Sequence, residues 1–214
     1  MENHEIRDKI LIGAEELFMK YGIRSVSMDN IANHLGVSKK TLYQYFTDKD
    51  EIVESVTKAH LDEQERQMTG VRDHSKNAIE ELVGVSVCLK ENMRGMNPSL
   101  LFDLQKYHHK AWNLWLKFRD NMVRKSIIAN LDQGKQEGYF RADINTEVLA
   151  TLRLENIQLA FDPSVFPPDR FALAEVQMQV LEHFVYGLFT DKGRKLYEKL
   201  KTKSPNLEQI LAQI

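Results

Sequence analysis

The sequence predicts an all-α protein, and three observations support this fold class. The chain has 214 residues with only five prolines and ten glycines. It has no alternating runs of β-branched residues, and its apolar residues recur at helical spacing. We expect about nine to ten helices, divided into an N-terminal three-helix unit over residues 1–48 and a C-terminal helical domain over residues 49–214.

The N-terminal unit begins with an amphipathic helix over residues 5–21, which ends at Gly22. Residues 27–46 then predict two short helices joined by a tight turn. Ser27 can cap the first of these helices and Ser38 the second. Gly36 occupies the place where a helix ends with positive φ. The pattern is that of a helix-turn-helix unit.

The second short helix has an unusual outward surface. Leu42 and Phe46 are one turn apart and can point inward, which leaves two lysines, a threonine, a glutamine and two tyrosines outside, without a carboxylate. From Lys20 to Lys49 there are five basic and two acidic residues, a balance of +3, although the whole chain carries −2. Such a surface suits phosphates and base edges.

The predicted DNA contacts fall into two groups. Hydroxyls and amines near helix N-termini meet phosphates, and longer polar side chains read base edges. Phosphate contacts are expected from Ser27, Ser38, Tyr45 and Lys49, and base contacts from Lys40, Thr41 and Gln44. The remaining candidates on this surface are Met28, Lys39 and Tyr43. Ser27 and Ser38 can equally serve as caps alone, and the two roles are compatible.

The run from Val26 to Ile52 resembles the DNA-binding domain of the tetracycline-repressor (TetR) family. The shared features are Ile31-Ala32, Gly36-Val37-Ser38, Thr41-Leu42-Tyr43-x-Tyr45-Phe46 and Lys49-Asp50-Glu51. One departure is Lys40, where members of that family often have glycine. The resemblance implies a dimeric, ligand-responsive transcriptional repressor that binds a palindromic operator in double-stranded DNA.

The rest of the chain predicts further helices in order. Asp48 and Glu51 form a capping-box pattern that starts a helix over residues 49–68, followed by a polar connector over residues 70–76. Asn97-Pro98 precedes a short helix with Leu100, Leu101, Phe102 and Leu104. The other expected helices cover residues 77–92, 110–136, 146–161, 171–189 and 192–203, with a short final segment over residues 207–214.

Two further surfaces are predicted in the C-terminal domain. A largely apolar effector pocket, with His108 or Asn156 giving polar direction, is expected around Val85, Cys88, Leu104, His108, Trp112, Trp115 and Asn156. For any one of these aromatic residues, ordinary core packing is the simpler interpretation. In the resembled family the last two long helices pair with their twins in the dimer, which implies an interface with Leu149, Leu152, Val176, Val180 and Phe184.

Composition excludes several other classes. Cys88 is the single cysteine, so neither an intramolecular disulfide nor a cysteine-rich zinc site is possible. His108 and His109 diverge by about 100° on a helix and cannot share one metal ion. No phosphate loop, nucleophile elbow or paired-carboxylate motif indicates an enzyme or a cofactor. No run approaches the roughly 20 apolar residues of a membrane span, and we expect a cytoplasmic location.

Two alternatives remain at this point. A DNA-binding architectural protein would need no effector and would have a filled core between residues 77 and 160. A helical protein-interaction module would bind duplex DNA without a steep salt dependence, or would not bind it.

Overall fold

The computed structural model describes residues 2–202, with side chains from residue 5 onward, and this part of the chain is helical without a strand. The only extended pairing in it is an isolated antiparallel bridge between Phe140 and Phe189. When the continuous α7 and α8 are counted as one helix, the described residues form ten helices. The predicted fold class is confirmed.

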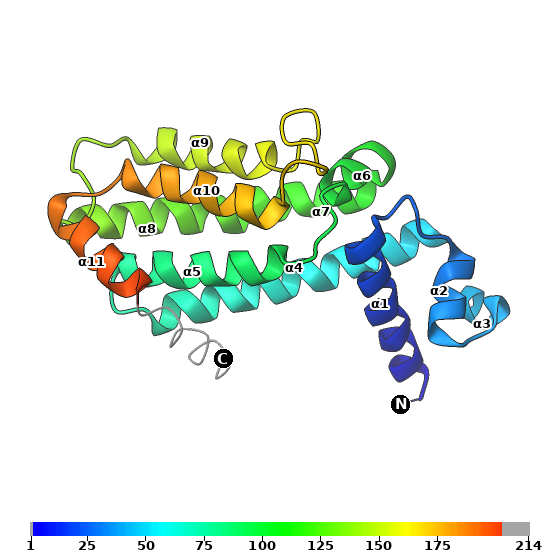
Figure 1. The fold of residues 1–214 in the computed structure, drawn as a ribbon. Helices are drawn as coiled ribbons and strands as arrows, with labels where there is room; N and C mark the ends of the chain where they lie inside the picture. The colour runs from blue at the N-terminus through cyan, green and yellow to red at the C-terminus, as the bar shows by residue number, and fades with distance from the viewer. Residues whose placement is uncertain (1, 203–214) are drawn as a thin grey trace.

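Three helices form one end of the molecule, at the right of Figure 1: α1 (Glu2–Tyr21), α2 (Met28–Leu35) and α3 (Lys39–Tyr45). The long helix α4 (Lys49–His74) starts beside them and continues into the body of the protein. The body contains α5 (Ala78–Met93), α6 (Leu100–Tyr107), α7 (His109–Phe118), α8 (Arg124–Gln136), α9 (Thr146–Leu159), α10 (Leu173–Tyr186) and α11 (Asp191–Lys201). The long helices run alongside one another, while α6 and the start of α7 lie next to α1 (Figure 1).

A five-residue π-helical segment, Arg119–Val123, joins α7 to α8 without a break. Its hydrogen bond runs from the Arg124 N–H to the Arg119 carbonyl, five residues back. The long helix predicted over residues 110–136 is therefore present, with one wider turn inside it.

Helix α4 is longer than the sequence indicated. The predicted polar connector over residues 70–76 is wrong in its first part, because α4 continues to His74. The reason is close packing: Val71 is buried, and a Cβ built on Gly84 of α5 would lie 2.6 Å from Val71 Cγ1. The missing side chain at Gly84 lets α5 approach this last part of α4. The predicted segment over residues 207–214 lies outside the described residues.

The N-terminal helices share a hydrophobic core with the body. Ile10 and Phe18 of α1, Ile31 of α2 and Leu42 of α3 form one buried cluster. The same cluster includes residues of α4 and also Leu104 of α6. Packing therefore continues across the predicted domain boundary between residues 48 and 49, which stays a prediction. None of the described helices is long and apolar enough to cross a membrane.

Candidate nucleic-acid interface and internal cavity

The turn between α2 and α3 is built by local hydrogen bonds. Gly36 adopts φ 65°, and its N–H reaches carbonyls at the end of α2. Ser38 caps α3, since its Oγ accepts the Thr41 N–H at 3.0 Å and lies 2.7 Å from Thr41 Oγ1. Ser27 caps α2, in a reciprocal arrangement with Asn30. These caps fix the direction in which α3 leaves the turn.

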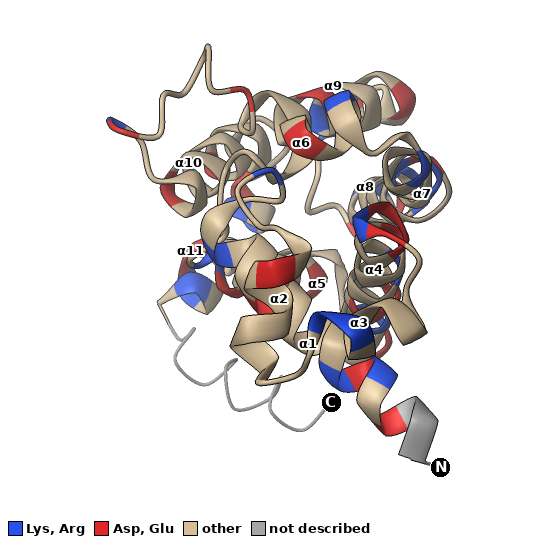
Figure 2. Cartoon of the chain, turned by 90° about the vertical axis from the view of Figure 1, so that its right-hand side faces the viewer, with Lys and Arg blue, Asp and Glu red and all other residues tan. Residues whose placement is uncertain are grey.

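Helix α3 presents its polar side chains outward because its apolar side chains are buried. Leu42 and Phe46 are at most 1% exposed. Ser38, Lys39, Lys40, Tyr43 and Gln44 are exposed, whereas Thr41 and Tyr45 are half-buried. Figure 2 looks onto this end of the molecule, and α3 carries its basic segments there. Most of the predicted contact residues therefore share one open surface.

Met28 is the exception among the predicted DNA contacts. Its side chain is buried in the hydrophobic cluster that the N-terminal helices share with α4 and α6, because the first residue of α2 turns inward beneath the Ser27 cap. The predicted contact through the Met28 side chain is therefore wrong. The neighbouring Ser27 is exposed, as predicted for a phosphate contact.

The two lysines of α3 have different surroundings. Lys39 Nζ forms an ion pair with Asp29 Oδ1 of α2 at 2.8 Å. The hydrogen bond and charge of Asp29 raise the pKa of the Lys39 amine. Lys40 forms no ion pair with any residue that the structure describes. Lys40 thus offers a full positive charge to a phosphate or base, whereas part of the field of Lys39 is balanced by Asp29.

Lys49 is less available than the sequence indicated. Its Nζ donates to the Ile23 carbonyl at 2.6 Å, and partial burial lowers the pKa of its amine. In this conformation the side chain fastens the connection between α1 and α2 to the start of α4. A phosphate contact by Lys49 stays a prediction and requires the amine to leave the Ile23 carbonyl.

Helix α6 is hydrogen-bonded directly to the N-terminal helices. The buried carboxylate of Asp103 accepts the Arg24 N–H at 3.1 Å and the Ser99 hydroxyl at 3.2 Å. The Asn97 N–H donates to the Met19 carbonyl at 2.7 Å. The bonds to Arg24 and Met19 join residues more than 75 positions apart, and no local sequence signal marked Asp103 as a partner of Arg24. They connect the N-terminal unit to the body of the protein.

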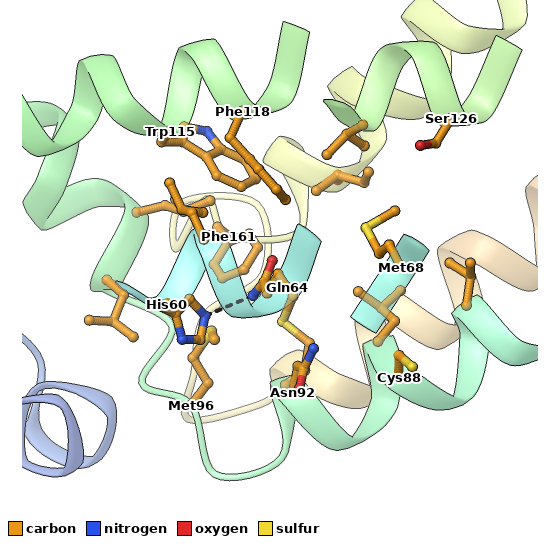
Figure 3. Close-up of a pocket in the computed structure, with 18 of the residues that line it drawn as sticks. His60, Gln64, Met68, Cys88, Asn92, Met96, Trp115, Phe118, Ser126 and Phe161 are labelled. Carbon is orange, nitrogen blue, oxygen red and sulfur yellow. Dashed lines mark hydrogen bonds between the residues drawn. The ribbon is translucent and has the colours of Figure 1, made fainter. Parts of the chain in front are cut away.

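The body encloses a mostly apolar cavity of about 230 Å³ (Figure 3). Its wall is built from α1, α4, α5, α6, α9, α10 and the long helix that contains the π segment. Among the predicted pocket residues, Val85, Cys88, Leu104 and Trp115 line this cavity. Burial raises the pKa of the free Cys88 thiol, so this side chain contributes a neutral, apolar surface.

The other three predicted pocket residues lie elsewhere. His108 stands between α6 and α7 and pairs with Asp50 of α4 through Nδ1 at 2.8 Å. Trp112 packs against the hydrophobic cluster that the N-terminal helices share with α4 and α6. Asn156 is half-buried on α9, about 100° around the helix from Ile157, which does line the cavity. The prediction of these three side chains as pocket residues is wrong.

The cavity also has polar wall residues that sequence reasoning missed. His60 of α4 lies 2.7 Å from Glu15 of α1 through Nδ1, and Gln64 Nε2 lies 2.7 Å from His60 Nε2 (Figure 3). Arg153 of α9 is 5% exposed and lines the cavity without a hydrogen-bonded or ionic partner for Nη1. Burial alone lowers the pKa of Arg153 to about 10. The sequence did not predict the burial of Arg153, because an arginine in an amphipathic helix normally faces solvent.

The predicted dimer residues divide into exposed and buried groups. Leu152 of α9 is 48% exposed, and Leu149 and Val180 are half-buried. Val176 and Phe184 of α10 are buried inside the subunit, and Phe184 lines the cavity. In this structure α10 turns these two side chains toward its own bundle, which leaves them little surface to offer a second copy of the chain. The surface of α9 that does remain open also carries Val148 and Leu159, which are 60% and 43% exposed.

Among residues 5–202, no three side chains of histidine, cysteine, aspartate or glutamate are arranged so that they could hold a metal ion.

Comparison with known proteins identifies the N-terminal unit. The model for bacterial regulatory proteins of the tetR family matches residues 10–56. The HTH-type transcriptional regulator YvaF of Bacillus subtilis is 28% identical over 189 residues, which cover 86% of this chain and 97% of that protein. The HTH-type transcriptional repressor KstR2 of Mycobacterium tuberculosis is 25% identical over 146 residues, covering 67% of this chain and 73% of KstR2.

Solved structures extend the likeness in fold to most of the chain. The structure of the ketosteroid transcriptional regulator KstR2 of Mycobacterium tuberculosis superposes with a TM-score of 0.62 at 22% identity, covering 86% of this chain and 95% of that one. A TetR-family regulator from Agrobacterium tumefaciens superposes with a TM-score of 0.73 at 14% identity, covering 88% of this chain and 100% of that one. The helical body, as well as the N-terminal unit, has the fold of these regulators.

Proposed function

Since residues 10–56 match the model for bacterial regulatory proteins of the tetR family, and the relatives that match along most of the chain are transcriptional regulators, we propose that this DNA-binding transcriptional regulator is a homodimeric repressor released by a small, mostly apolar effector. Its target is a pseudo-palindromic operator in double-stranded DNA. The observation that carries the effector part of this proposal is the cavity of about 230 Å³ between the helices of the body. This space differs from the filled core that we expect of a purely architectural protein.

Helix α3 is the recognition element. Seven residues at about 1.5 Å each give it a length of roughly 10 Å, close to the width of about 12 Å of the B-DNA major groove. Lys40, Thr41 and Gln44 are proposed to meet base edges, and the half-buried Tyr45 to meet phosphate with its hydroxyl. Ser38 adds a helix N-terminus, where backbone N–H groups favour an anion.

The proposed dimer pairs α9 and α10 of two subunits. The exposed Val148, Leu152 and Leu159 provide an apolar surface on α9, and the half-buried Val180 continues it on α10. Two copies of α3 in one dimer would meet two half-sites about 34–36 Å apart, one turn of the duplex.

The proposed release acts through α4 and α6. Both helices line the cavity, and both contact the N-terminal unit, α4 by continuing from it and α6 through Asp103. An effector that favours another arrangement of these helices would change the separation of the two α3 helices. A coupling free energy of about 1–3 kcal/mol would give a 5- to 150-fold change in operator affinity.

Selection of bound fragments from a random DNA pool tests the DNA-binding part of the proposal. We expect one recurring pseudo-palindrome, bound by a dimer with steep salt dependence. A thermal-shift screen of small apolar molecules, followed by operator competition, tests the effector part. Half-sites without two-fold symmetry would contradict the dimer, and stabilising ligands that leave operator affinity unchanged would contradict release by an effector.

A further inference from the structure

The strongest unexplained feature of the cavity is the side chain of Arg153. Arg153 is 5% exposed and lines the cavity, and its buried Nη1 has no hydrogen-bond partner; its guanidinium forms no ion pair with the residues that the structure describes. Among residues 5–202, the other buried ionisable side chains are paired: Asp103 accepts two hydrogen bonds, and Glu81 accepts the Asn130 amide at 2.8 Å. Arg153 is therefore the exception within the part of the chain whose side chains are described.

An unpaired buried cation is costly, because water is removed and nothing replaces it. Burial lowers the pKa of Arg153 to about 10, so the side chain still carries its charge at neutral pH. A second buried donor, Trp115 Nε1 of α7, also has no partner among the described residues, but Figure 3 draws this nitrogen on the ring edge that faces away from the other cavity side chains. Arg153 is therefore the unsatisfied charged donor of the cavity wall, and an acceptor that enters the cavity would pair with it.

The cavity is long, and several of the side chains that line it are flexible. Its lining residues on α4 run from Val53 to Met68, a span of about 22 Å at 1.5 Å per residue. Four methionines line it, namely Met19, Met68, Met93 and Met96. Because methionine is unbranched and polarizable, such a wall adapts to apolar chains of different shape.

The polar groups of the cavity are not equivalent. On the α1 and α4 side, Glu15, His60 and Gln64 already satisfy one another through hydrogen bonds. On the α8 and α9 side, Arg153 is unpaired, and the Ser126 hydroxyl has only the Met122 sulfur at 3.9 Å as its acceptor. A negative group entering the cavity would find its free donors on this second side.

We propose that the effector is an elongated apolar molecule with one terminal oxyanion, and that this oxyanion pairs with the guanidinium of Arg153. The inference rests on the proposed function, in which the cavity receives an effector. A planar guanidinium binds a carboxylate or a phosphate ester with two parallel hydrogen bonds, so both headgroups share the required chemistry. The apolar tail lies along α4, between the methionines.

The test uses four probes with the same ten-carbon chain and different headgroups: decanoate, decyl phosphate, decanol and decylamine. Binding to the full-length protein is measured by calorimetry. We expect one of the two anionic probes to bind at least about tenfold more tightly than decanol, as for a hydrogen bond to a charged group. Decylamine is expected to bind most weakly. The tighter anionic probe identifies the headgroup.

Three variants separate the charge of Arg153 from general effects. Arg153→Met is expected to reduce the affinity of the anionic probe to that of decanol without weakening decanol, and to raise the melting temperature of the unliganded protein, because a buried unpaired charge is removed. Arg153→Lys keeps the charge and is expected to keep part of the preference for the anion. Arg66→Met, at an exposed position of α4, is the matched control and should change none of these values.

Equal affinities of wild-type protein for decanol and both anionic probes would overturn the oxyanion inference, as would an unchanged preference in Arg153→Met. Affinity for the selected operator is measured alongside, with and without each probe. If decanol alone releases the operator, the effector mechanism stands and the oxyanion inference fails. If the anionic probe binds through Arg153 but leaves operator affinity unchanged, the oxyanion inference stands and the proposed release mechanism fails.

Discussion

Replacing Asp103 with alanine should destabilise the connection between α6 and the N-terminal helices. The buried carboxylate of Asp103 accepts two hydrogen bonds, from the Arg24 N–H and the Ser99 hydroxyl. Hydrogen bonds to a charged group contribute about 1.5–3 kcal/mol each. Because the substitution also removes a carboxylate that is costly to bury, we expect a net loss of about 2–4 kcal/mol in unfolding free energy.

For a chain of this size such a loss lowers the melting temperature by about 4–16 °C. Circular dichroism during urea unfolding measures the free energy, and hydrogen exchange measures the protection of the Arg24 amide, which should fall. Asp132→Ala is the control, because Asp132 is an exposed aspartate in the interior of α8. If the two variants differ by less than about 0.5 kcal/mol, Asp103 does not hold the two parts together.

Three further predictions concern DNA contacts, the dimer and pH. Tyr45→Phe should weaken binding to all DNA sequences alike, whereas Gln44→Ala should relax preference at particular base pairs by about 1–3 kcal/mol; equal changes in base preference, measured on a panel of operator variants, would refute the division of roles. Leu152→Glu should give monomers in sedimentation experiments and lose operator binding, and a monomer with full operator affinity would refute the coupling. Burial raises the pKa of Glu81, so the folded protein holds this proton at pH values where the unfolded chain has lost it. Stability should therefore fall as pH rises above the ordinary glutamate pKa, and Glu81→Gln should remove this slope when unfolding free energy is measured from about pH 4 to 8; an identical slope in the variant would contradict it.

Sequence reasoning succeeded where structure is determined by nearest neighbours in the chain. The caps at Ser27 and Ser38 and the positive φ at Gly36 depend on residues within a few positions, and all three are present. Leu42 and Phe46 were placed correctly because one helical turn fixes their common direction. The outward surface of α3 follows from the same local rule.

Sequence reasoning failed where the rotation of one helix against another determines which of its residues face the interior. Trp112 and Trp115 are both aromatic residues of the same helix, but only Trp115 faces the cavity. Helix α10 has apolar residues on more than one side, so the sequence could not tell whether Phe184 faces its own bundle or a second subunit. The end of α4 depended on contact between Val71 and Gly84, which are thirteen positions apart.

The wider turn at Arg119–Val123 determines which residues of the long helix face the interior. Phe118 and Val123 both line the cavity, yet residues five apart on a regular α-helix diverge by about 140°. Removing one residue from this turn would rotate Val123, Ser126 and Ile127 by about 100° relative to Trp115. A homologue with a plain α-helix here would therefore offer its ligand a different set of side chains, even where its aligned residues are the same.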